Sequence, residues 1–380
     1  MESYADVVVI GGGVAGTMAA IAAARAGKKT VLCERSGALG GMWTSGLIGV
    51  TLDAENKNGL LKEFLQKVND EGGCATTFET KKYVLEKMCI GAGVELCLGC
   101  SFVSAENVNG KITEVKCTSK SGVITFKAER YIDATGDGDV AASAGCEFFF
   151  GNGEGKVQPM SMVALVEIKS GLDEKYLGWD GRNNFKALLD SLGAAYSLGC
   201  PNIALCQGEI YQLSINQEYG KNPLDCKSVS LASVNARKEI FETVKKLRKS
   251  GMNITLVTTP EFIGVREGRR IKCRYNITLD DIVSGARFND AVCRVTYWVD
   301  IHSFVPGDKG YSDSGITVKP YDIPLRAMLP IGAENLILAG RCIGGDFCAH
   351  ASYRVMGNMA AVGEAAGALA AKQLAKKQYM

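Results

Sequence analysis

The two histidines of this 380-residue chain are the side chains best suited to proton transfer. Imidazole titrates near neutral pH, so it can take or give a proton during a reaction. His302 follows Asp300, and His350 precedes Arg354, whose planar guanidinium suits a carboxylate or other negative charge. We predict active-site roles for His302, His350 and Arg354. Each has a structural alternative: a contact within a lobe for His302, a loop brace for His350 and a salt bridge for Arg354.

Arg266, Arg269 and Arg270 form a basic cluster of the kind that binds carboxylates. A cluster this dense is more often solvated or paired with acids, so its role stays open. The segment 158–161 (Gln-Pro-Met-Ser) is a candidate lining of the same site.

The chain has 14 cysteines, which are scattered rather than framed, and we expect reduced thiols. Cys97 and Cys100 are the one tight pair. They follow an apolar run, which predicts that they lie at the end of a strand. A redox pair instead needs a helix N-terminus to lower its thiol pKa. No second pair and no histidine lies nearby in the sequence, so neither a redox role nor a zinc site is expected, and no metal is predicted.

A glycine-rich turn near the start has the spacing of a dinucleotide-binding motif. A buried-strand run at 6–10 is followed by Gly11, Gly13 and Gly16, a helix of small residues, a second strand and then Glu34. The first glycine makes a tight turn, the second lets main-chain amides approach a pyrophosphate, and the third lets helix and strand pack closely. Phosphates would lie at the helix N-terminus, and the acid would accept hydrogen bonds from a ribose.

The acid at position 34, in place of an arginine, argues against a 2′-phosphate and leaves FAD or NAD. A second glycine-rich loop follows at 35–46, where a nicotinamide-binding domain would normally enter its next helix. Flavoproteins of the glutathione-reductase type have an E-R-x₃–₅-G-G loop here. Taken alone, a mobile surface loop is an equal alternative.

Three further segments resemble those of one family. The A-T-G-D-G-D run at 134–139, the closing strand and loop at 336–346 and the final helix beginning near Arg354 are similar to FAD-dependent oxidoreductases related to fumarate-reductase-like and glucose-inhibited-division-like flavoproteins. Shorter matches lie at 266–271, 278–282, 297–302 and 321–326.

The motif and the resemblance together predict a set of FAD contacts. They fall at Gly11, Gly13, Val14, Ala15, Gly16, Glu34, Arg35, Gly40, Gly41, Met42, Trp43, Phe102, Val103, Ala134, Thr135, Gly136, Asp137, Arg341, Asp346, Val355 and Met356. The N-terminus of the final helix would face the flavin pyrimidine edge. The Trp43 ring could wall the site or lie in the core.

Two departures from the family pattern matter. Some members attach their flavin covalently through a histidine in the second glycine loop, but residues 42–45 (Met-Trp-Thr-Ser) contain none, so we predict noncovalent FAD. The closing segment 344–350 also differs from the family's R-C-I-S-x-x-H-x-A pattern. Because this change lies beside the flavin, substrates are not inferred from the family.

The expected fold is α/β: a Rossmann-like FAD-binding domain of three layers, with a parallel sheet plus a β-meander, and an inserted α+β substrate lobe. The FAD-binding domain would be discontinuous, at 1–157 and 322–380, around a substrate domain at 158–321. Meander strands are predicted at 111–116 and 123–127, and lobe elements at 162–168 (strand), 185–192 and 234–249 (helices). The Gly/Ala-rich helix at 356–374 could pack internally or against another subunit.

Composition limits the partners. A formal net charge of +2 gives no reason to expect nucleic acid, and no long apolar run predicts a membrane span. The N-terminus lacks a basic region before its apolar stretch, so we expect a cytoplasmic protein rather than a secreted one.

The main functional hypothesis is an FAD-dependent oxidoreductase that transfers a hydride between flavin N5 and a small organic molecule, with a histidine moving the proton. The alternative is an electron-transfer subunit working with a redox partner protein, although no ferredoxin-like cysteine run is present. A homo-oligomer stays open. No second nucleotide motif indicates a built-in NAD(P)H domain.

Overall fold

The computed structural model describes residues 1–169, 171–307 and 315–377. Its first elements form a parallel β-α-β unit, as the N-terminal motif predicted: β1 (Glu2–Ile10), α1 (Val14–Arg25) and β2 (Thr30–Glu34). The other long partner of β1 is β6 (Gly122–Asp133), also parallel. Parallel neighbours need a crossover connection, and the small-residue helix α1 provides it here.

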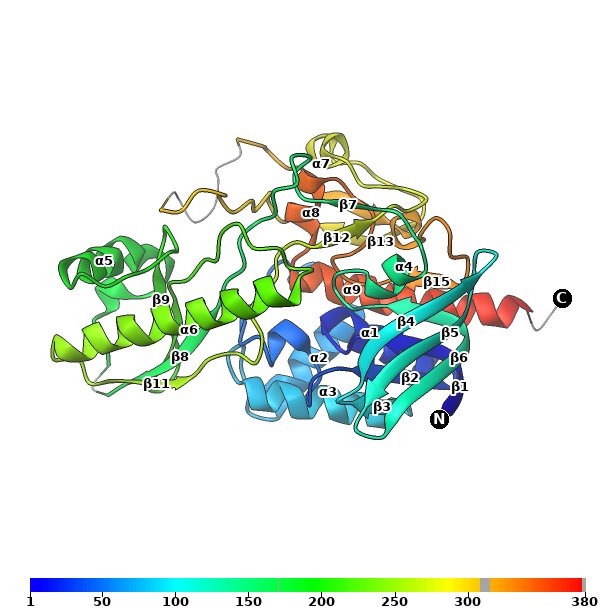
Figure 1. Ribbon diagram of the computed structural model, residues 1–380, viewed down its shortest axis with the longest axis horizontal. Helices are drawn as coiled ribbons and strands as arrows, with labels where there is room; N and C mark the ends of the chain where they lie inside the picture. Colours follow the sequence, from blue (N-terminus) through cyan, green and yellow to red (C-terminus); the bar gives the residue numbers. More distant parts are fainter. Residues whose placement is uncertain (170, 308–314, 378–380) are drawn as a thin grey trace.

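The parallel part of the main sheet has the order β3-β2-β1-β6, with β15 alongside β6. Its outer strands are β3 (Glu95–Leu98) and β15 (Leu336–Leu338). The latter comes from near the end of the chain, so residues far apart in sequence share one sheet (Figure 1). The carboxyl ends of these parallel strands lie at one edge, which is where open α/β sheets bind their ligands.

Two further layers cover this sheet. The meander strands β4 (Ser101–Val108) and β5 (Lys111–Ser119) continue antiparallel from β6, and β4 also contacts β2. Helix α9 (Met356–Lys377) packs against α1 and contacts β1, β6 and β15. The three-layer arrangement of meander, parallel sheet and helices confirms the predicted fold class.

The contact between α9 and α1 depends on glycine. A Cβ atom at Gly363 would lie 2.1 Å from the carbonyl oxygen of Ala15, and one at Gly367 would lie 2.1 Å from that of Ala19. Any larger residue would push the helices apart, so the small-residue face of α9 packs inside the molecule. The Gly/Ala-rich face of α9 therefore contacts α1 of the same chain.

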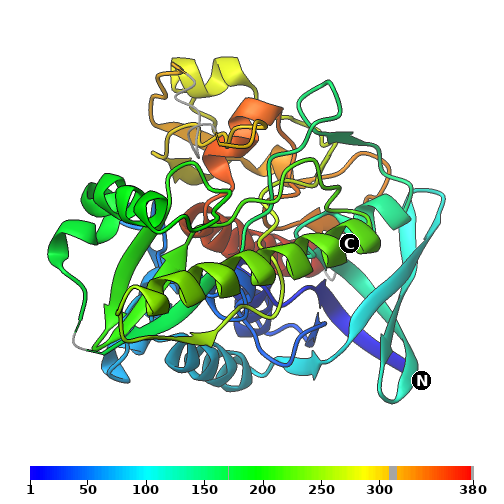
Figure 2. The ribbon, with the colours of Figure 1, turned by 60° about the vertical axis from the view of Figure 1, so that its left-hand side comes forward.

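A smaller lobe extends from this body (Figures 1 and 2). Its antiparallel sheet has the order β11-β8-β10-β9 and is flanked by two helices. The bounds are β8 (Val163–Ile168), α5 (Gly178–Ser191), β9 (Asn202–Gln207), β10 (Ile210–Ser214), α6 (Cys226–Lys249) and β11 (Ile254–Thr258). The predicted inserted α+β lobe is therefore present. Helices α5 and α6 are both longer than the predicted ranges 185–192 and 234–249, because each begins earlier in the chain.

The separate core of this lobe is shorter than the range 158–321. Its buried members run from Met160 to Ile263, whereas residues from Ile271 to Val299 belong to the main core. Main-chain pairing explains the difference. Strand β12 (Arg269–Ile271) pairs with β7 (Phe148–Phe150), and β13 (Ala291–Val295) pairs with β14 (Tyr321–Pro324), so the later part returns to the larger body. Local patterns in the sequence did not reveal this return.

The other helices are short or lie at the edges. They are α2 (Gly59–Asp70), α3 (Phe78–Ala92), α4 (Asp139–Ser143), α7 (Leu279–Ser284) and α8 (Phe347–Tyr353), with 3₁₀ turns at Gly41–Trp43, Glu174–Tyr176 and Leu325–Met328. Among the described residues, no helix combines the length and apolar character needed to cross a membrane.

Candidate active site

The first glycine turn is shaped by close contacts on one side and open space on the other. A Cβ atom at Gly16 would lie 1.8 Å from the Gly11 carbonyl oxygen, and one at Gly11 would lie 2.4 Å from that of Ala134. A Cβ atom at Gly13, by contrast, would meet nothing within 4 Å. No side chain among the described residues caps the N-terminus of α1, which begins at Val14. Its first amides, including that of Ala15, are therefore available to a phosphate group.

Glu34 is held rigidly at the end of β2. Its Oε2 atom accepts a 2.6 Å hydrogen bond from the amide of Gly12, and its Oε1 atom accepts a 2.8 Å bond from the amide of Ser36. The side chain is buried. Each carboxylate oxygen still has a lone pair free, so the group can accept bonds from a ribose diol in a fixed orientation.

The second glycine loop docks on the first. The amide of Gly40 donates a 2.8 Å hydrogen bond to the carbonyl of Gly12, and Gly40 has a φ of 100°, a left-handed value that favours glycine. A Cβ atom at Gly41 would lie 3.0 Å from the Cα of Gly13. The two loops thus form one continuous main-chain surface. Met42 follows directly, with its side chain against Gly46 and Gly264.

The Trp43 ring does not wall this surface. It is fully buried, stacks on Phe64 with 4.8 Å between ring centroids, and donates from its indole nitrogen to the hydroxyl of Thr51. A cofactor contact from Trp43 would therefore come from its main chain. The guanidinium of Arg35 lies 4.9 Å from the ring centroid of Phe262, which lies next to Ile263 of the smaller lobe's core.

The segment after β6 returns the chain to the first glycine turn. Buried Asp133 accepts hydrogen bonds from the amide and hydroxyl of Thr135, and burial raises the pKa of its carboxyl to about 6. Gly136 has a φ of 88°, and Asp137 accepts a 2.8 Å bond from Arg341. The predicted contacts 134–137 and Arg341 are thus brought together.

Phe102 and Val103 behave differently. Phe102 lines a surface hollow of about 530 Å³ together with Asp139 and Arg269, whereas the side chain of Val103 is largely exposed. Of these two predicted contacts, only Phe102 faces a hollow.

The closing segment forms the short helix α8, which leads directly into α9. The Asp346 carboxylate caps α8 by accepting a 2.8 Å bond from the amide of Ala349, and it accepts a second bond from the amide of Leu279. Both oxygens of Asp346 are therefore committed to main-chain amides. Val355 and Met356 lead into α9 directly afterwards.

His302 lies in a largely buried polar cluster. Its Nδ1 atom is 2.7 Å from the side-chain nitrogen of Gln217, whose oxygen accepts a 2.6 Å bond from the hydroxyl of Tyr219. Because an amide nitrogen only donates, we assign Nδ1 as the acceptor and place the ring proton on Nε2. That atom is 3.3 Å from Oδ1 of Asp300.

Arg354 joins the same cluster. It donates a 2.7 Å hydrogen bond to the carbonyl of Asp300 and lies 3.3 Å from its carboxylate. The side-chain oxygen of Gln158 accepts a 3.0 Å bond from the His302 amide. Two residues predicted from sequence, His302 and Arg354, are therefore neighbours. The salt-bridge alternative for Arg354 is also present.

Charges in the cluster set the protonation states. Burial lowers the pKa of His302 to about 4, with the positive charge of Arg266 adding to the effect. Burial alone would raise the pKa of Asp300, but its hydrogen bond with His302 and the charge of Arg354 hold that pKa below the ordinary value. At neutral pH the imidazole is neutral and the carboxylate is ionised.

His350 lies apart from these hydrogen bonds. It is fully buried on α8, its ring stands edge-on to Tyr353, and neither ring nitrogen has a hydrogen bond of normal geometry within the described chain. Burial and the charge of Arg270 hold its pKa well below the usual range. Orphaned buried nitrogens are costly, so they fit a bound group that supplies partners.

The arginine cluster separates into different roles. Arg266 donates to the carbonyl of Pro159 and the hydroxyl of Ser161, at 2.6 and 2.8 Å. Arg269 pairs with Asp139, and buried Arg270 pairs with Glu267. Arg269 and Arg270 therefore form ion pairs with acids, which is the alternative given above for this cluster. Arg266 instead adds a positive charge beside His302.

Gln217 and Tyr219 were missed by sequence reasoning. They follow strand β10 in a polar run, but nothing local in the sequence indicates a partner far along the chain. The sequence shows no second cysteine pair near Cys97 and Cys100, but the fold brings further thiols to this pair. Cys33 and Cys117 lie beside Cys100.

The paired glycine loops, the fixed acid and the three-layer sheet define a dinucleotide-binding flavoprotein. The chain belongs to the FAD dependent oxidoreductase family, whose model matches residues 6–380. It is therefore an FAD-dependent enzyme. No curated protein sequence matches it.

Solved structures share the fold at low identity. A geranylgeranyl bacteriochlorophyll reductase-like protein from Thermoplasma acidophilum matches with a TM-score of 0.50 and 13% identity, over 100% of this chain and 80% of that one. The OxyS anhydrotetracycline hydroxylase from Streptomyces rimosus gives 0.51 and 12%, over 98% and 63%. The myxobacterial chondrochloren halogenase CndH gives 0.51 and 11%, over 99% and 76%.

Proposed function

We propose that this enzyme oxidises or reduces a small organic substrate beside bound FAD, and that His302 moves the accompanying proton. The largely buried Asp300–His302–Gln217 arrangement next to Arg354 is the observation that carries the proposal. When bound, FAD supplies a hydride acceptor or donor at its N5 atom.

The residues of this chain that would hold FAD follow from the open space around Gly13. Main-chain amides at the start of α1 would bind the pyrophosphate, and Glu34 would accept hydrogen bonds from the ribose. The loop at Gly40 and Gly41 would close over the same groups.

His302 would act at Nδ1, the atom that accepts from Gln217. A substrate group that displaces the Gln217 amide can hand its proton to this nitrogen, and the neighbouring Asp300 carboxylate stabilises the charged ring that results. The Nε2–H group points at that carboxylate throughout, which fixes the ring. In the opposite direction the same atom returns the proton.

Arg354 and Arg266 would hold negative charge on the substrate. The pKa of Arg266 falls to about 10 through burial and repulsion from Arg354, so it stays charged at neutral pH. Two partly buried cations that repel each other favour an anionic group such as a carboxylate, which relieves their repulsion.

The spectrum of the purified protein under anaerobic NADH and then NADPH tests the reaction class. Bleaching of the flavin spectrum would indicate a reductase half-reaction on an unsaturated acceptor. Unchanged flavin would direct the search to organic donors, or to a redox partner protein if the enzyme serves as an electron-transfer subunit. Absence of flavin binding would contradict the whole proposal.

A further inference from the structure

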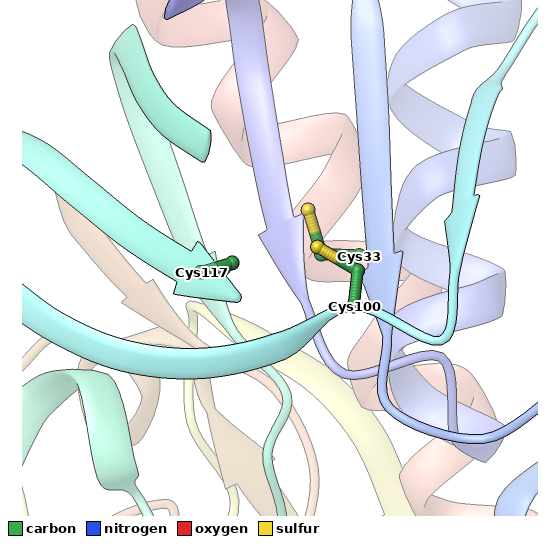
Figure 3. Close-up of side chains that lie close together, drawn as sticks. All are labelled: Cys33, Cys100 and Cys117. Atoms are coloured by element: carbon green, nitrogen blue, oxygen red, sulfur yellow. The ribbon is translucent and has the colours of Figure 1, made fainter. Parts of the chain in front are cut away.

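Three cysteine thiols from separate parts of the sequence meet at the edge of the main sheet. Cys33 lies on β2 next to its last residue, Cys100 precedes β4 and Cys117 lies on β5 (Figure 3). Their sulfur atoms all lie within 4.8 Å of one another. All three residues are buried. The cluster is separate from the His302 site and takes no part in the proposed reaction.

A fourth thiol adjoins them. Cys97 on β3 is the register partner of Cys33 across the parallel pair, so its side chain stands on the same face of the sheet as that of Cys33. It is only partly buried, whereas the other three are covered. Cys97 therefore supplies both a fourth sulfur and a route from solvent to the cluster.

The main chain around the cluster is fixed. The amide of Cys100 donates a 2.8 Å bond to the carbonyl of Glu34, and the amide of Gly99 donates a 3.1 Å bond to that of Ser36. Gly99 has a φ of 63°, which lets the Cys97–Cys100 turn close tightly. The sulfurs are thus brought together by strand pairing and a defined turn.

The spacing suits a single soft ion. Around a tetrahedral Zn²⁺ with Zn–S distances of about 2.3 Å, neighbouring sulfurs stand roughly 3.8 Å apart. The three sulfur atoms already lie within 4.8 Å of one another, so small side-chain rotations would bring them to this distance. A cubane iron–sulfur cluster places each thiolate on a different iron and spreads the sulfurs farther. Calcium and magnesium prefer oxygen ligands, and the grouped ligand atoms are all sulfur.

We propose that Cys33, Cys97, Cys100 and Cys117 form a thiolate site for Zn²⁺ that joins the parallel sheet to the meander. Binding replaces the thiol protons with one metal ion and leaves the oxidation state of the sulfurs unchanged. Because Glu34 follows Cys33 directly, the ion would also brace the strand end that carries this acid.

Cobalt titration of the reduced, metal-free full-length protein tests the site. Co²⁺ bound by several thiolates gives sulfur-to-metal charge-transfer absorption in the near ultraviolet and strong visible bands of tetrahedral Co²⁺. We expect both to saturate at about one ion per chain and to disappear on adding Zn²⁺. The titration is made with FAD-free protein, so its result does not depend on the proposed function.

Variants locate the ion. Cys33→Ser and Cys117→Ser should each abolish the tetrahedral Co²⁺ spectrum, whereas Cys89→Ser, a buried cysteine on α3, should leave it unchanged. Metal analysis of protein grown with added zinc should show about one zinc per wild-type chain. Wild-type protein with no thiolate–cobalt band would overturn the proposal even if the variants fail to fold. Equal spectra in wild type and Cys117→Ser would overturn it as well.

Discussion

His302 and Gln217 are in direct contact, with 2.7 Å between Nδ1 and the amide nitrogen. Gln217 follows strand β10 of the smaller lobe's sheet, whereas the segment carrying His302 follows Val299 of the main core. The contact therefore joins the two bodies at the proposed active site. Ligand sites commonly form at such junctions, because each body contributes its own side chains.

Replacement of either histidine tests proton transfer. We expect His302→Ala and His350→Ala to retain FAD, because neither lies in the glycine loops or beside Glu34. Turnover should fall by about 10²–10⁴-fold where the proton path is lost. Flavin content and steady-state rates measure the two effects separately. Unchanged turnover in His302→Ala would refute the assignment of proton transfer to this residue, and a loss in His350→Ala alone would move the assignment to His350.

The pH dependence should reflect the low pKa of His302. This pKa is lowered to about 4, so the ring is neutral and able to accept a proton above that value and loses this capacity as the pH falls through it. For the direction in which His302 acts as base, kcat/KM should stay level from about pH 8 down to about pH 5 and then decline. An acidic limb near the ordinary histidine value of 6.5 would contradict the described environment.

Removal of the positive charge of Arg266 should move the acidic limb of the kcat/KM profile. Arg266 lowers the pKa of His302, so Arg266→Gln should raise this pKa and shift the decline in kcat/KM to higher pH. Arg269→Gln is the matched control, because Arg269 pairs with Asp139 instead. Equal profiles for the two variants would show that Arg266 does not act on His302. Flavin absorbance at each pH checks that cofactor loss is not the cause.

The β-α-β unit that carries the predicted nucleotide-binding residues could be predicted from the sequence, because its signals are local. Gly11, Gly13, Gly16 and Glu34 lie within one β-α-β unit, so spacing alone places them together. Family-like segments added the return at 134–137, which packs against Gly11 in the structure.

Contacts between distant segments could not be predicted in the same way. Gln217, which Tyr219 bonds, meets His302 only because the segment after Ile263 returns to the larger body. Cys33 and Cys117 meet Cys100 because the meander passes across the parallel sheet. Each depends on a tertiary arrangement that no local periodicity encodes.

FAD should be released intact when the protein is denatured. Residues 42–45, next to the docked glycine loop, contain no histidine for covalent attachment. Acid or heat precipitation should leave the yellow colour in the supernatant, where its absorbance gives the FAD stoichiometry. Flavin that stays with the washed pellet would contradict noncovalent binding.

Two glycines of the first turn should respond in opposite ways to the same added methyl group. The site of a Cβ atom at Gly13 is empty to 4 Å, and its φ of −68° suits alanine. Gly13→Ala should therefore fold normally. If the pyrophosphate occupies that space, the methyl group would collide with it, and we expect FAD affinity to fall tenfold or more, which corresponds to about 1.4 kcal/mol.

Gly16→Ala places its methyl group against protein instead. The Cβ atom would lie 1.8 Å from the Gly11 carbonyl oxygen, so helix and turn must separate. We expect the free energy of unfolding of FAD-free protein to fall by about 1–3 kcal/mol, typical of overpacking. Denaturant unfolding and FAD titration of both variants distinguish the two effects. Because Gly13→Ala spares the protein's own packing, unchanged FAD affinity in that variant would show that the phosphate does not bind at this turn.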